Sequence, residues 1–84
     1  MPRPVTFVKA ALTQFRRLLP DPADRAVALE RLYEIADDPH RALAELGAET
    51  NIRRTRILGL LFYLLPVEEG RHLAAQLVVV KVRR

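Results

Sequence analysis

The feature that most constrains the fold is an uncharged, strongly apolar run, Ile57–Leu65, in a chain of only 84 residues. As a helix, this run would be apolar on every side, and such a helix has to be buried on every side. A chain of this length buries only about 60% of the surface that it exposes when unfolded. The run therefore predicts the central helix of a small bundle, an interface between copies, or both.

Prolines and capping residues divide the rest of the chain into further predicted helices. Asp21-Pro22 and Asp38-Pro39 each place an N-cap residue before a proline, which is favoured at the first helical position. Residues 5–19 separate apolar from polar side chains at helical spacing, and the polar side carries only basic charges. The predicted helices are Val5–Leu19, Pro22–Asp37, Pro39–Leu46 and a fourth that ends near Leu65. The fourth begins near Thr50 or Asn51, either of which suits an N-cap.

The C-terminal segment is open to two interpretations. Val78–Val82 holds four β-branched residues in five, which favours a strand. Since no second strand-like run is recognised, either a helix continues through the valines or the strand pairs with another chain. The expected fold is all-α: one helical domain over residues 1–84, with four to five short helices around the apolar helix and with 78–84 as a strand or tail.

Composition excludes several classes of function. The sequence has no cysteine and no serine, so it offers neither a disulfide framework nor the nucleophile of a thiol enzyme or a serine triad. Its three glycines are far apart, so it has no glycine-rich phosphate loop. Glu69 and His72 have a spacing known from di-iron bundles, but the further inward-facing glutamates of such sites are missing. We expect no enzyme, no metal and no cofactor.

Charge patterning points to an anion. The net charge of +4 hides an acidic middle, residues 21–49, between two basic ends. Arg53, Arg54 and Arg56 fall in the first turn of the fourth predicted helix, where the helix dipole disfavours cations unless an anion compensates. Phosphate is the natural anion for such a site. Internal ion pairs with acids such as Glu45 and Glu49 are the alternative explanation.

The segments next to these arginines indicate which kind of anion is bound. A short helix, the glycine turn at residues 47–49 and a basic helix follow one another in the order of a helix-turn-helix. We therefore expect binding of DNA or RNA, with the phosphate-binding residues Asn51, Arg53, Arg54, Arg56, Arg16 and Arg17, and with Lys81, Arg83 and Arg84 as outer contacts.

The alternative function is that of a non-catalytic interaction module. In that case the apolar helix and the valine-rich tail form a homo-oligomer or partner interface through Leu61, Phe62, Leu65, Val78, Val80 and Val82. No apolar run approaches the roughly 20 residues of a membrane span, and no signal peptide is recognised, so the expected location is cytoplasmic.

Overall fold

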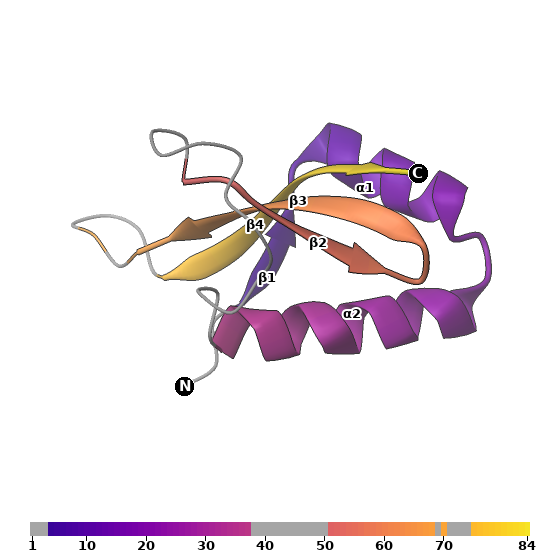
Figure 1. Cartoon of the computed structure of the whole chain (residues 1–84), viewed down its shortest axis with the longest axis horizontal. Coiled ribbons are helices and arrows are strands. Elements are labelled where there is room, and N and C mark those ends of the chain that lie inside the picture. Colours follow the sequence, from indigo (N-terminus) through magenta and orange to yellow (C-terminus); the bar gives the residue numbers. More distant parts are fainter. Residues whose placement is uncertain (1–3, 38–50, 69, 71–74) are drawn as a thin grey trace.

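In the part of the chain that the structure describes, two helices pack on one face of a four-stranded sheet (Figure 1). A computed structural model describes residues 4–37, 51–68, 70 and 75–84. In chain order the elements are β1 (Val5–Phe7), α1 (Lys9–Leu18), α2 (Pro22–Asp37), β2 (Arg53–Ile57), β3 (Leu60–Val67) and β4 (Gln76–Arg83). The expected all-α bundle is wrong, since the described residues form a mixed α/β fold.

The sheet has the strand order β1-β4-β3-β2. β3 is antiparallel to both β2 and β4, and β1 runs parallel to β4. The strand expected as one alternative for Val78–Val82 is therefore confirmed as part of β4. The expectation that it has no partner within the chain is wrong, because β4 lies between β3 and β1.

The apolar run forms strands and a tight turn instead of a helix. Ile57 ends β2, Leu58 and Gly59 form the turn, and Leu60 begins β3. Both turn residues have positive φ, 51° and 79°, as a two-residue hairpin of the type I′ class requires. Glycine favours this conformation, whereas leucine pays about 1–2 kcal/mol for it. A short apolar run cannot be assigned to helix or strand by periodicity alone, so this error is an expected one.

The helices follow local signals more closely. α2 has the predicted bounds, Pro22–Asp37, and the Asp21 carboxylate caps it by accepting a 2.9 Å hydrogen bond from the Ala23 N–H. α1 begins at Lys9 because the preceding residues pair with β4 as a strand. The predicted helix Pro39–Leu46 lies outside the described residues.

The core lies between the helices and the inner face of the sheet, the face turned toward them. Phe15 of α1 joins Phe7 and Phe62, with ring centroids 4.9 and 6.1 Å away. Leu32 of α2 is completely buried in the same cluster, whereas Tyr33, which the helical pattern places on the apolar side, is 47% exposed. In β3, buried and partly exposed residues alternate throughout, so one face of the strand belongs to the core and the other faces away.

A β-bulge in β4 determines which of its side chains face the core. Tyr63 pairs with Lys81 but the next residue, Leu64, pairs with Val79, so Val80 is an extra residue. Counted from the buried Val79, unbroken alternation would turn Lys81 inward and Val82 outward. The bulge reverses this, and Val82 is 1% exposed while Lys81 is exposed.

α1 continues along the edge of β4 where β1 ends. The Gln14 side-chain oxygen accepts a 2.9 Å hydrogen bond from the Val82 N–H. A backbone donor on the strand edge is thereby satisfied by a helix side chain. This contact also brings the last turn of α1 to the C-terminal end of β4.

A candidate nucleic-acid interface on the outer face of the sheet

Side chains from three strands form two rows on the outer face of the sheet, the face that neither described helix covers. The register places one row across β2, β3 and β4 and a second row two residues further along. Adjacent strands are about 4.8 Å apart, so members of a row are immediate neighbours. We call these six side chains the basic face: Arg56, Leu61 and Arg83 in one row, and Arg54, Tyr63 and Lys81 in the other.

Tyr63 lies at the centre of the second row and is contacted from β4. The Arg83 Nε donates a 2.9 Å hydrogen bond to the Tyr63 hydroxyl oxygen. The Arg83 Cζ lies 5.7 Å and the Lys81 Nζ 5.8 Å from the ring centroid, both within cation–π range. The aromatic ring and two cations are thus held together by contacts within the sheet.

The cations change the acidity of the phenol. The hydrogen bond from Arg83 lowers the pKa of Tyr63 below its usual 10.0, and desolvation opposes this change in part. The charges of Arg83, Lys81 and Arg54 add to the lowering. A lowered pKa for an acid that becomes negative shows that the site favours an anion.

This environment predicts a measurable titration. In a Tyr33→Phe variant, Tyr63 is the one remaining tyrosine, and its phenolate absorbance should appear below pH 10 and move upward in Arg83→Ala. Because folding lowers this pKa, the associated stabilisation is present above pH 10 and is lost as the pH falls through the lowered value. Titration of the unfolded chain in urea supplies the reference, and equal pKa values in the folded and unfolded chains would contradict the arrangement.

The predicted phosphate-binding residues are only partly brought together. Arg54 and Arg56 point to the outer face, but Arg53 is on the inner face and only 9% exposed. Asn51 is not a helix N-cap, and its amide instead donates a 3.3 Å hydrogen bond to the Pro66 carbonyl. Since residues 53–57 form a strand, the proposed helix N-terminus and the helix-turn-helix are both wrong.

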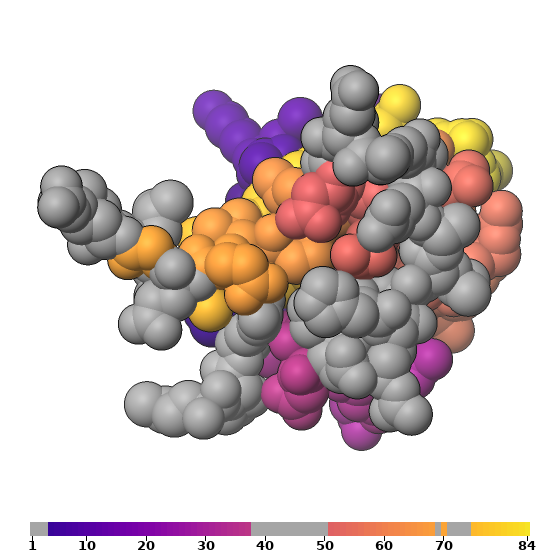
Figure 2. Space-filling view, turned by 60° about the vertical axis from the view of Figure 1, so that its left-hand side comes forward, coloured from indigo at the N-terminus to yellow at the C-terminus, as the bar shows by residue number. Residues whose placement is uncertain are grey.

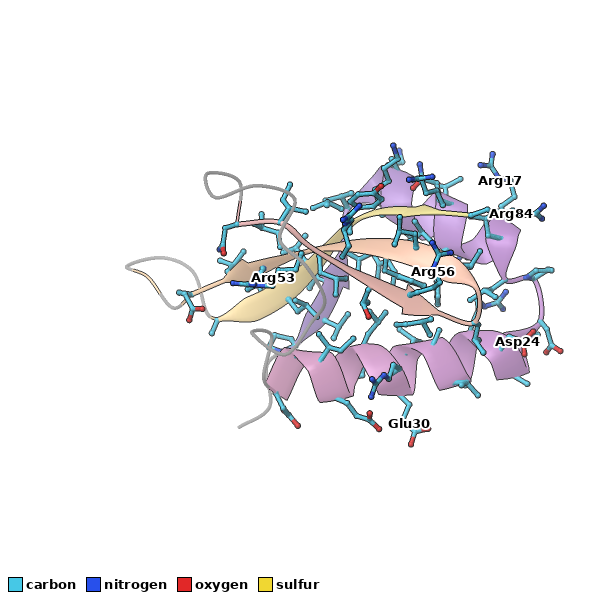
Figure 3. The ribbon with its side chains drawn as sticks, viewed as in Figure 1. Arg17, Asp24, Glu30, Arg53, Arg56 and Arg84 are labelled. Atoms are coloured by element: carbon cyan, nitrogen blue, oxygen red, sulfur yellow. The ribbon has the colours of Figure 1, made fainter. Side chains whose placement is uncertain are left out.

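Further cations gather at the end of the sheet near the β2–β3 turn. The Arg56 Nη1 donates a 3.3 Å hydrogen bond to the Gly59 carbonyl in that turn. Arg84 follows β4 at the same end, and Gln14 brings the last turn of α1, with Arg16 and Arg17, close to it. Figure 3 shows Arg17, Arg56 and Arg84 toward this end of the molecule.

Most acidic side chains of the described residues lie in the other layer. Asp24, Glu30, Glu34 and Asp37 all belong to α2, and Figure 3 shows Asp24 and Glu30 extending from that helix. Glu34 forms a 2.8 Å ion pair with Arg31 of the same helix. None of the described strands contains an acidic residue, and the charged side chains that they place on the outer face are all basic.

Sequence reasoning missed Tyr63 as a site residue, although a signal was present. Arg54-x-Arg56 and Lys81-x-Arg83 both repeat with period two, which places each pair on one face of a strand. Tyr63 lies between these two segments in the sequence. It belongs to a run whose residues are alternately buried and partly exposed, because the run forms a strand. The assignment of residues 50–65 to a helix concealed this relation.

The residues expected at an assembly interface are divided between the two faces. Phe62 and Val82 are buried in the core, so they are not accessible to a partner. The other four are partly exposed on the outer face: Leu61, Leu65, Val78 and Val80. Figure 2 shows atoms of β2 and β3 at the surface of the molecule.

The described residues lack two further kinds of feature. They include no group of three or more His, Asp or Glu side chains placed to hold a metal ion. No helix among them is long and apolar enough to cross a membrane. Comparison of the chain with protein-family models finds no matching family, and comparison with curated proteins finds no similar sequence.

Proposed function

We propose that this protein binds single-stranded nucleic acid across the basic face. The observation that supports the proposal is the position of Tyr63, a partly exposed aromatic ring on the outer face of the sheet. Lys81 and Arg83 lie against this ring, and Arg54 is its neighbour on β2. Proteins that bind single strands combine cations for the backbone with aromatic side chains on which bases stack. The basic face has cations and an aromatic ring on adjacent strands, which are about 4.8 Å apart.

The geometry favours a single strand over a duplex. Duplex reading normally inserts a helix or a two-stranded ribbon into the major groove. The basic face is instead a pleated surface across three strands, and such a surface suits splayed bases that lie on it. The acids of α2 lie in the opposite layer, so they repel an approaching polyanion less than acids on the same face would.

The test compares two double variants that remove the same charge. Binding of a fluorescent single-stranded oligonucleotide, RNA or DNA, is followed by anisotropy at several salt concentrations. Arg54→Ala/Arg83→Ala is expected to weaken binding at least tenfold at low salt. The slope of log affinity against log salt should fall by about 1.4, or about 0.7 for each lost phosphate contact.

The matched control is Lys9→Ala/Arg31→Ala, which removes two cations from the helical layer. It should leave both the affinity and the salt slope close to those of the wild type. Equal losses in the two double variants would mean that only net charge matters, and this would exclude the basic face as the binding surface. Absence of salt-sensitive binding by the wild type at micromolar protein would exclude the function itself.

Assembly with a second copy is the other candidate, and one observation favours it. Leu65 and Val78 are cross-strand neighbours on the outer face, next to the basic rows, and both are partly exposed. This apolar half of the face could be covered by a partner. Light scattering of the wild type and of Leu65→Thr would test this, and a monomer at high concentration would refute it.

A further inference from the structure

The tip of the β2–β3 hairpin carries an exposed leucine in a conformation that leucine disfavours. Leu58 has a φ of 51° and is 50% exposed, while the next residue is Gly59. Asparagine or aspartate before glycine is the usual choice in such a turn, because these residues tolerate positive φ. Leu58 therefore has a backbone conformation that is unfavourable for leucine, and its apolar side chain is not buried. Such an outlier calls for a functional explanation.

The surroundings of Leu58 are cationic. Arg56 precedes the turn and its Nη1 donates to the Gly59 carbonyl. Leu61, just after the turn, pairs with both Arg56 and Arg83, so the tip adjoins the first row of the basic face. Arg84 lies at the same end of the sheet (Figure 3). The Leu58 side chain would therefore contact a ligand that these arginines bind.

We propose that Leu58 inserts against the bases of the bound strand while the neighbouring arginines hold its phosphates. This inference rests on the proposed function and adds a salt-independent contact to it. Leucine is one of the apolar side chains that proteins insert between stacked bases as wedges. A base has an apolar face that leucine can contact, whereas a phosphate has none. Leu58 would therefore contact the base of a nucleotide, and the arginines would bind its phosphate.

A second exposed apolar residue provides a contrast. Val27 is 52% exposed on α2, but it has regular helical backbone and lies in the layer that holds Asp24 and Glu30. Its neighbours on the helix carry both signs of charge, including Arg31 one turn away, so they do not attract a polyanion as the basic face does. Val27 therefore serves as the matched position for an apolar-to-polar change that should not affect binding.

The test uses a variant that should be more stable than the wild type. Leu58→Asn gives the turn the sequence Asn-Gly, which is preferred for this hairpin, and the melting temperature should rise by roughly 4 °C or more. Affinity for the oligonucleotide should nevertheless fall about tenfold, with an unchanged salt slope. An oligonucleotide containing 2-aminopurine should brighten on binding the wild type, because insertion unstacks the base, and brighten much less with Leu58→Asn.

The outcomes separate this inference from the proposed function. If the wild type binds with the expected salt slope and Leu58→Asn binds equally well, the wedge is refuted while the basic face stands. If the wild type does not bind, both fail. Val27→Gln should bind as the wild type does, and an equal loss there would refute a specific role for Leu58. Leu58→Gly also suits positive φ, and it should show the same loss of affinity if Leu58→Asn does not fold.

Discussion

Replacing Phe62 by alanine is expected to lower the free energy of unfolding by about 3–5 kcal/mol, as measured by urea denaturation. The Phe62 ring is fully buried on the inner face of β3 and contacts Phe15 of α1 edge to face. Its removal leaves a cavity between the sheet and the helical layer. Since small domains are stable by only about 5–15 kcal/mol, this loss is at least about a fifth of the free energy of unfolding, and at the low end of that range it is all of it.

The neighbouring residue is the control for this prediction. Leu61 is partly exposed on the outer face, and Leu61→Ala should cost less than about 1 kcal/mol. In a helix buried on all sides, both substitutions would be strongly destabilising. Similar large losses at the two positions would therefore contradict the alternation of β3.

Exchanging Lys81 and Val82 should also destabilise the protein by about 3 kcal/mol or more. The double variant Lys81→Val/Val82→Lys keeps the composition of the chain but places a lysine at a position that is 1% exposed. A buried cation without a partner is costly, and either the ammonium loses its proton or the end of β4 leaves the sheet. Thermal and urea denaturation would measure the loss.

Because of the bulge, the exchange of Val80 and Lys81 is a matched control for the exchange of Lys81 and Val82. Val80 and Lys81 both lie on the outer side of β4, so Val80→Lys/Lys81→Val should change the unfolding free energy by less than about 1 kcal/mol. If β4 alternated without a bulge from the buried Val79, Lys81 would face the core, and both exchanges would stabilise the protein by replacing this lysine with valine. The pair of variants therefore tests directly which side chains of β4 face the core.

Local signals made α2 predictable, but they did not reveal the sheet. The Asp21 cap, the following proline and a helical burial pattern are all contained within one segment, so the sequence alone is enough to place this helix. β3 is different, because its identity depends on pairing with β2 and β4 and on the turn at Leu58. Leucine is not typical of such a turn, so the strongest hairpin signal was absent.

The candidate site was predictable in its chemistry but not in its construction. The arginines at 54 and 56 stood out as a positive group next to an apolar run, and they do share a face of the sheet. The burial of Arg53 and the addition of Tyr63 and Lys81 follow from strand alternation and from the bulge in β4. Pairings between distant segments cannot be read from local composition, so these parts required the structure.

The parallel pairing of β1 with β4 has a consequence for how the chain acquires its structure. Val5 lies opposite Leu77, so the sheet joins residues more than seventy positions apart. Such non-local contacts form slowly, because a long loop has to close before they contribute any stability. During synthesis β1, α1, α2 and the β2–β3 hairpin emerge before the strand that connects them. Until β4 arrives, β3 is paired with β2 alone and its apolar inner face is incompletely covered, which is the kind of exposed surface that makes partly folded chains prone to aggregation.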